Sequence, residues 1–406
     1  MKIAVVKPDY HIRGGFEIVM ERIMADLKER GHRVDYIQVD MSKPDYRLGS
    51  MSIPPEVYHS HEEFFRYALS VDKFRRLKLK QYDIVLTTQP PSFAVEHKRV
   101  APLFYHHLKI YYDLYEVYKD TGIAKGIDHA LTRDLIRDID SRFITNDKYY
   151  IAGSSHVADR LRLYNGITSP IATFEAGIAD DFYSYDGPLS FGDPICVGRH
   201  EFPKRPELFV HAMKHVKGLS GRIIGEGGKT GDLKLVDSYL EKLHKNGEEI
   251  DDSYLWKSFM FQLDSLKKTS HEYRGSNVIF SGRLSHEKLI EAYAEAMCVV
   301  CPAYEEDYGL TAIEAMAFGK PVIVCRDGGG LAEFIENGEN GFVVEPTGEA
   351  IAGAINTLRD NPDKLRQMSR NAYEFSRQYS WRQGLDSLHG LLLDIQSGQW
   401  KGRWSV

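Results

Sequence analysis

The chain has 406 residues, 43% of them hydrophobic, which is enough for two globular domains with ordinary cores. Its formal net charge of −6 argues against general nucleic-acid binding. The four cysteines all lie in apolar runs, so we expect buried free thiols in a reducing cytoplasm rather than disulfides or a metal site. No apolar run is long enough to predict a membrane-spanning helix.

The start of the chain predicts a β-strand, a loop and a helix. Residues 2–6 form an apolar strand, residues 17–30 carry apolar side chains at helical spacing, and residues 33–39 form a second strand. Gly14 and Gly15 lie where the loop meets the helix, and glycines there let backbone N–H groups approach a ligand closely. A plain tight turn also explains these two glycines.

A basic amphipathic segment, residues 64–80, follows residues 41–60, which show no periodicity and which we expect to be a loop. Five lysines or arginines lie between positions 73 and 80. Such a helix can rest on an anionic membrane surface, which would give the protein a peripheral contact with the inner face of a membrane. An ordinary helix packed on a sheet accounts for the same pattern, and we prefer that interpretation.

Two histidines, His106 and His107, follow the next predicted strand. An imidazole at a strand end can donate a hydrogen bond to a sugar hydroxyl or to a departing phosphate oxygen, although a core or surface histidine is the usual case. Asp138 and Asp140 have the DxD spacing of a metal site. They fall inside a predicted helix, residues 128–143, rather than in a loop after a strand, so we predict no metal there.

The second half of the chain begins after a linker over residues 180–192, which contains Asp, Gly, Ser and Pro without periodicity. A strand over residues 194–197 is followed by Arg199 and Lys204. Two cations after a strand can neutralise a diphosphate and stabilise it as it leaves. Two solvent-facing bases are the simpler alternative.

A glycine-rich run that starts at Gly225 looks like a phosphate-binding P-loop but lacks the first glycine of that motif, which would fall at Ile223. Residues 232–268 predict a long charged helix, to which we assign no function. A strand over residues 278–281 leads to Arg283.

Residues 299–346 have the most informative pattern: a buried strand, a polar loop, a helix, a second buried strand and a glycine-rich loop before another helix. Glu306 precedes the first helix and Glu314 lies inside it. Helix N-termini suit an anion such as a diphosphate, and carboxylates beside it can accept hydrogen bonds from hydroxyl pairs. Either glutamate alone would be an ordinary solvated acid, but the two at this spacing predict a ligand site.

This segment resembles the retaining glycosyltransferases of family 4. The resemblance is carried by Glu306-x7-Glu314 with Gly309-Leu310 between them, by Glu314-Ala-Met-Ala-x-Gly-x-Pro-Val, and by Gly328-Gly329 before Glu333. One departure is Asp307, where the family often has glycine. The run over residues 305–309 is similar to that of mannosyl-transferring members.

The resemblance implies an α/β fold with two Rossmann-like domains facing a cleft, called GT-B. It places an N-terminal, acceptor-side domain at residues 1–185 and a C-terminal domain for the nucleotide-sugar donor at residues 192–380. Residues 381–406 are then a helix and tail that cross back to the N-terminal domain.

The resemblance also implies roles for individual residues. It assigns catalysis to Glu306, His107, Arg199 and Lys204. It assigns donor binding to Gly14, Gly15, Arg199, Lys204, Gly225, Arg283, Glu306, Tyr308, Gly309, Leu310, Thr311 and Glu314. It places His106 and Glu17 on the acceptor side. Within the donor site, Glu306 is expected at the transferred sugar and Glu314 at the ribose.

The implied activity is transfer of a hexose from a GDP- or UDP-linked sugar to a hydroxyl of a glycan, lipid-linked or small-molecule acceptor, without a metal or other cofactor. A nucleotide-sugar epimerase, a sugar phosphorylase and a non-catalytic sugar-nucleotide-binding module share this architecture. We rank them lower, because an epimerase does not need the Glu306-x7-Glu314 pattern and a phosphorylase needs a cofactor-bearing lysine that we do not find.

Overall fold

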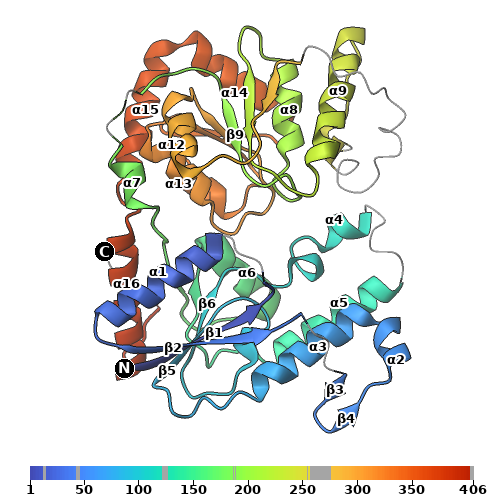
Figure 1. Ribbon diagram of the computed structural model, residues 1–406, viewed down its shortest axis with the longest axis vertical. Coiled ribbons are helices and arrows are strands. Elements are labelled where there is room, and N and C mark those ends of the chain that lie inside the picture. Colours follow the sequence, from blue (N-terminus) through green and yellow to red (C-terminus); the bar gives the residue numbers. More distant parts are fainter. Residues whose placement is uncertain are drawn as a thin grey trace. The chain divides into compact units, whose positions relative to one another are not determined.

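The chain folds into two α/β units in the computed structural model, which describes all residues except 12–14, 43–45, 121–126, 186, 188, 254, 257–275 and 403–406. Unit 1 comprises Met1–Ala176 and Arg382–Val406, and unit 2 comprises Gly177–Trp381 (Figure 1). The division therefore lies at Gly177, before the linker that the sequence suggested. The short helix α7 (Asp180–Tyr183) belongs to unit 2 because its Phe182 packs against Tyr293 and Phe318 of that unit.

Unit 1 is built on a parallel six-stranded sheet in the order β2-β1-β5-β6-β7-β8. The strands are β1 (Lys2–Asp9), β2 (Arg33–Asp40), β5 (Ile84–Thr87), β6 (Val100–Phe104), β7 (Ile151–Ala152) and β8 (Ala172–Thr173). The helices are α1 (Gly15–Glu29), α2 (Pro55–Ser60), α3 (Glu62–Arg75), α4 (Tyr115–Asp120), α5 (Ile127–Ser141), α6 (Ser155–Asn165) and α16 (Trp381–Ser397). Ile3 to Val6 of β1 are fully buried, as expected of a central strand with helices on both faces.

The C-terminal helix α16 returns to unit 1 after the chain has formed unit 2. Leu388, Leu391 and Leu392 on this helix are buried. At its polar side, Asp386 pairs with Arg30 at 2.5 Å. The two parts of unit 1 that lie farthest apart in the sequence are therefore joined by both apolar burial and an ion pair.

Residues 41–60 are not the plain loop that the sequence predicted. A two-stranded antiparallel hairpin joins β3 (Arg47–Leu48) and β4 (Met51–Ser52), and α2 follows it. Ile53, Tyr58 and Leu69 form a small separate core beneath these elements. The strands contain only two residues each, too few to show a period of two in the sequence.

The basic segment over residues 64–80 forms a helix only as far as Arg75, where α3 ends. Phe74 and Leu79, two apolar residues between the basic ones, are fully buried in the core of unit 1. These two side chains are therefore not available to a membrane surface, and the packed-helix interpretation that we preferred holds for them. Within the described ranges, no helix combines the length and the apolar character that crossing a membrane requires.

Unit 2 is built on a second parallel sheet, in the order β11-β10-β9-β12-β13-β14. The strands are β9 (Ile195–Val197), β10 (Gly221–Ile224), β11 (Val278–Phe280), β12 (Val299–Cys301), β13 (Val322–Cys325) and β14 (Gly341–Val344). The helices are α7, α8 (Pro206–Lys214), α9 (Thr230–Asn246), α12 (His286–Glu295), α13 (Leu310–Ala317), α14 (Gly348–Asp360) and α15 (Pro362–Ser376). The α/β class with two Rossmann-like units is thus confirmed.

Three details of unit 2 differ from the sequence prediction. Strand β14 was not predicted, and the helix expected at Leu331 is a five-residue 3-10 helix, η3 (Gly330–Phe334). Helix α9 ends at Asn246 because Gly247 adopts a left-handed conformation, with φ +69°, and caps it. The remainder of the predicted helix, up to residue 268, lies largely outside the described residues. All four cysteines are buried free thiols, as expected.

We predict that Phe74→Ala destabilises unit 1 by about 3–5 kcal/mol, because it removes a fully buried aromatic side chain. Urea or thermal unfolding followed by circular dichroism measures this loss. The exposed Lys78 provides the control, and Lys78→Ala should change the free energy of unfolding by less than about 0.5 kcal/mol. Equal stability of the two variants would contradict the placement of Phe74 in the core.

Candidate functional site

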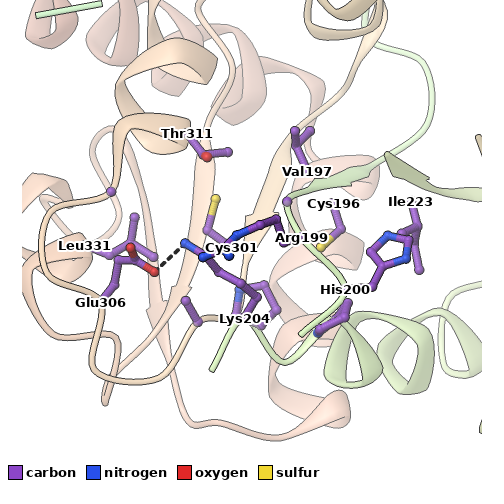
Figure 2. A pocket seen from close by; sticks show the side chains of 15 residues that line it. Cys196, Val197, Arg199, His200, Lys204, Ile223, Cys301, Glu306, Thr311 and Leu331 are labelled. Atoms are coloured by element: carbon purple, nitrogen blue, oxygen red, sulfur yellow. Dashed lines mark hydrogen bonds and ion pairs between the residues drawn. The ribbon is translucent and has the colours of Figure 1, made fainter. Parts of the chain in front are cut away.

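The carboxyl edge of the unit 2 sheet carries a pocket open to solvent, with about 420 Å³ of space between its walls and the solvent at its mouth. Its walls come from the loops that follow β9, β12 and β13 and from the start of α13 (Figure 2). Parallel strands end at the same edge of a sheet, so loops that are far apart in the sequence converge there. This pocket is therefore a candidate ligand site of unit 2.

Lys204 and Glu306 meet in this pocket. Lys204 Nζ lies 2.6 Å from Glu306 Oε2, and the two side chains are 30% and 20% exposed (Figure 2). The two residues are 102 positions apart, and the side-by-side pairing of β9 and β12 brings their loops together. A cation and a carboxylate that were predicted separately therefore form one ion pair that a ligand can reach.

Arg199 lines the same pocket from the loop after β9. Its side chain is 68% exposed and pairs with Glu201 at 3.2 Å. A guanidinium held this loosely can turn toward an incoming anion at little cost in conformational energy, because an exposed ion pair contributes about 0–1 kcal/mol.

Two glycines, one beside the pocket and one lining it, let neighbouring loops approach closely. Gly225 has φ +126°, and a Cβ there would lie 2.0 Å from the carbonyl oxygen of Gly198. Gly309 has φ +109°, and its Cβ would lie 2.4 Å from Leu331 Cδ1. A larger residue at either position would push the loops apart. Gly309 also opens α13, so the free N–H groups and positive dipole end of that helix face the pocket beside Thr311.

Glu314 has different surroundings from Glu306. It is half-buried on α13 and accepts a hydrogen bond from Tyr293 Oη at 2.9 Å. Burial raises the pKa of its carboxyl group above the usual value, with the Tyr293 hydrogen bond acting in the opposite direction. Glu306 thus lines the pocket and Glu314 does not, and the two carboxylates lie in different environments.

Three predicted donor contacts of unit 2 do not line the pocket. Tyr308 is buried and packs edge-on against Phe334, with ring centroids 5.2 Å apart, so it supports the loop and does not line the pocket. Arg283 is exposed after β11, next to Gly282. Leu310 is half-buried at the start of α13.

The placement of His107 corrects the choice between the two histidines of unit 1. Its ring is 1% exposed, stacks on Tyr112 with centroids 4.2 Å apart, and donates from Nε2 to Asn165 Oδ1 at 2.7 Å. Burial lowers the pKa of His107 to about 3, so it stays neutral. His107 is therefore a core residue, and the half-buried His106 is the histidine that a ligand can reach.

The N-terminal loop of unit 1 is only partly described, since Gly14 lies outside the described residues. Gly15 opens α1, and Glu17 in its first turn pairs with Lys7 at 2.9 Å. Lys7, near the end of β1, is 3% exposed and was not among the residues predicted from the sequence. A lysine within an otherwise apolar strand was the sequence feature that could have indicated this residue.

Asp138 and Asp140, which have the DxD spacing, lie in different surroundings. Asp138 pairs at the surface with Arg142 at 2.6 Å. Asp140 is buried and accepts hydrogen bonds from the hydroxyl groups of Tyr67 and Tyr112, and burial raises its pKa to about 7. Among the residues that the structure describes, no three His, Cys, Asp or Glu side chains gather as metal ligands do.

The two Rossmann-like units have the fold of the GT-B glycosyltransferases, and the pocket at the carboxyl edge of unit 2 carries an ion pair that can contact an anionic ligand. Residues 262–375 match the family model described as "Glycosyl transferases group 1".

Curated relatives match parts of the chain. The D-inositol 3-phosphate glycosyltransferase of Rhodococcus erythropolis is 36% identical over 114 residues, which are 28% of this chain and 26% of that protein. The enzyme of the same name from Nocardia farcinica is 28% identical over 221 residues, 52% of this chain and 42% of that protein. The matches therefore span less than half the length of these relatives.

Solved structures match nearly the whole chain at low identity. Sucrose-phosphate synthase from Thermosynechococcus elongatus has a TM-score of 0.65 and 19% identity, covering 98% of this chain and all of that one. WaaG, a glycosyltransferase involved in lipopolysaccharide biosynthesis, has a TM-score of 0.63 at 14% identity, covering 98% of this chain and all of that one. HepE of Anabaena in complex with UDP has a TM-score of 0.60 at 15% identity, covering 97% of this chain and all of that one. Similarity at this identity establishes the fold.

The Lys204–Glu306 ion pair predicts opposite effects of two substitutions on binding of inorganic pyrophosphate. Lys204→Met should weaken binding by about 1.5–3 kcal/mol, because it removes a charge-assisted hydrogen bond. Glu306→Gln should strengthen binding, because Lys204 is no longer shared with a carboxylate. Isothermal titration calorimetry measures both changes. Lys245→Met, which alters an exposed lysine of α9, is the control and should leave binding unchanged. Weaker binding by Glu306→Gln would contradict this account.

Proposed function

We propose that the protein is a retaining glycosyltransferase that moves a hexose from a nucleotide-diphosphate sugar to a hydroxyl acceptor. The observation that carries the proposal is the Lys204–Glu306 pair at the carboxyl edge of unit 2, at 2.6 Å. Glu306 belongs to the segment that matches the glycosyltransferase family model. The UDP complex of a protein with the same fold supports a nucleotide donor.

In this proposal the residues of unit 2 stabilise the leaving group. Negative charge develops on the diphosphate as the bond to the sugar breaks. Lys204, Arg199 and the N-terminus of α13 compensate that charge, so no divalent metal takes part. Glu306 contacts the transferred sugar and Glu314 the ribose.

In this proposal the acceptor hydroxyl attacks the sugar from the face that the leaving group departs from. Attack from that face retains the configuration at the anomeric carbon. The departing phosphate then receives the proton of the acceptor hydroxyl. The lysine next to Glu306 favours this route over a covalent intermediate, because a carboxylate paired at 2.6 Å is a weaker nucleophile than a free one.

The acceptor is assigned in the proposal to unit 1, with His106 and Glu17 as its candidate contacts. The names of the curated relatives make phosphorylated cyclitols the first small-molecule acceptors to test, beside glycans and lipid-linked saccharides. The resemblance over residues 305–309 puts GDP-mannose first among the donors, with UDP-hexoses next.

The decisive experiment screens GDP- and UDP-sugars for release of the nucleoside diphosphate, with and without acceptors. Glu306→Gln should lower kcat on the best donor, while Glu314→Gln should mainly weaken nucleotide binding, by about 1.5–3 kcal/mol. Wild-type kinetics in both variants would contradict the site assignment.

Interconversion of two nucleotide-sugars without transfer would indicate an epimerase. Nucleotide binding without any turnover would indicate a non-catalytic module.

Metal independence has its own test. Turnover of the best donor should be unchanged by EDTA, because Arg199, Lys204 and the α13 N-terminus stabilise the diphosphate. The rate is compared in EDTA and in added Mg²⁺ or Mn²⁺. Activity that EDTA abolishes and either cation restores would overturn this part of the proposal.

A further inference from the structure

Arg205, directly after Lys204, is the largest charged group buried beneath the pocket. It is 1% exposed, and its guanidinium donates to four acceptors on the neighbouring loops. Nε lies 2.8 Å from the carbonyl oxygen of Pro302, and Nη2 lies 3.3 Å from that of Ala303. Nη1 and Nη2 reach the two carboxylate oxygens of Asp327 at 2.9 and 2.5 Å. One side chain therefore joins the loops after β9, β12 and β13.

The backbone is strained at two positions beside the ion pair. Arg205 has φ +48° and Glu305 has φ +49°, in the left-handed region that non-glycine residues seldom adopt. They stand immediately next to Lys204 and Glu306, and His11 is the one other non-glycine residue with positive φ in the described part of the chain. Such strain persists only where surrounding contacts hold it, and it tends to gather at functional sites.

Asp327 connects the two strained positions. Its carboxylate holds Arg205, and its carbonyl oxygen accepts from the backbone N–H of Glu305 at 2.9 Å. Glu306 itself continues the contact, since its carbonyl oxygen accepts from the N–H of Gly330 at 2.8 Å. Arg205 thus acts on Glu306 through Asp327 and Glu305, and on Lys204 as its direct neighbour in the chain.

An aromatic stack covers the guanidinium. Trp256 lies parallel to Phe202 with centroids 5.6 Å apart, and stacks on Tyr304 at 5.8 Å. The Arg205 guanidinium lies 5.3 Å from the ring centroid of Tyr304 and 5.8 Å from that of Trp256, within reach of cation–π attraction. These rings help to bury the Arg205 guanidinium completely, whereas the Asp327 side chain stays 31% exposed, so water is kept from one partner of the pair.

We propose that Arg205 is a positioning residue that holds Lys204 and Glu306 at their working distance, an inference that rests on the proposed function for its effect on turnover. The hydrogen bonds of the guanidinium offset the backbone strain at residues 205 and 305 and fix the positions of three loops relative to one another. Without it, the loops relax to unstrained conformations and the Lys204–Glu306 geometry is lost. Arg205 does not contact the ligand, and its effect passes through Lys204 and Glu306.

The test compares Arg205→Met, Arg205→Lys and Asp327→Asn with a matched control, Lys214→Met. Lys214 is buried in the same unit and pairs with Asp237 at 2.6 Å, away from the pocket. Melting temperature, pyrophosphate affinity and, on the best donor, kcat/KM are measured for each. Both Arg205→Met and Lys214→Met should lower the melting temperature. Only the changes at Arg205 and Asp327 should lower kcat/KM, on the order of 10- to 100-fold, as expected when reacting groups are misplaced.

Arg205→Lys should recover part of the loss, because an ammonium pairs with Asp327 but does not reproduce the fork of hydrogen bonds. In a Lys204→Met background, Arg205→Met should change pyrophosphate affinity by less than about twofold, because the residue through which it acts is already gone. If Arg205→Met unfolds the protein, Asp327→Asn gives the same comparison with a milder change.

Wild-type pyrophosphate affinity in folded Arg205→Met and Asp327→Asn proteins would overturn the inference, as would additive effects of the Lys204 and Arg205 substitutions. If Lys214→Met lowers pyrophosphate affinity as much as Arg205→Met does, Arg205 contributes only to stability, and the inference is also overturned. Pyrophosphate binding does not require turnover. A wild-type protein that turns over no donor but shows the expected affinities would therefore contradict the proposed function and leave the inference standing.

Discussion

The parallel pairing of β9 with β12 and of β12 with β13 is the constraint on which the site in unit 2 depends. Each of these strands is short and buried, so each must end at the same edge of the sheet as its neighbours. The polar residues that follow these strands therefore lie close together at that edge. A cation from one loop and a carboxylate from another then compensate each other's charge, which lets both stay partly buried in the absence of a ligand.

Charge burial at this edge is arranged in two layers. The outer layer, Lys204 and Glu306, is 20–30% exposed and can exchange its partner for a ligand. The inner layer, Arg205, is fully buried and donates hydrogen bonds to four acceptor atoms. It cannot move without leaving a buried charge unpaired. An accessible ion pair above a buried one is a physical means of presenting reactive groups in a fixed geometry.

Unit 1 shows the opposite use of polar groups. His107 and Asp140 are buried and hydrogen-bonded to neighbours of the core, and burial shifts both pKa values toward the neutral form. These residues hold helices on the sheet and are closed to solvent. His106, which a ligand can reach, is the neighbour of His107 in the sequence. Position along the chain therefore did not tell the accessible histidine from the buried one.

The sequence by itself determined the alternation of strands and helices, the α/β class, the buried thiols and the segment with Glu306 and Glu314. These features depend on local periodicity, glycine positions and spacing, all of which act over a few residues. Only the tertiary structure decided that Phe74 and Leu79 are core, that His107 is buried while His106 is not, and that Arg205 joins three loops. Burial and side-chain pairing depend on which distant segments pack together, and no local pattern records that. The contact between Lys204 and Glu306 exists because sheet order brings residues 102 positions apart to one edge.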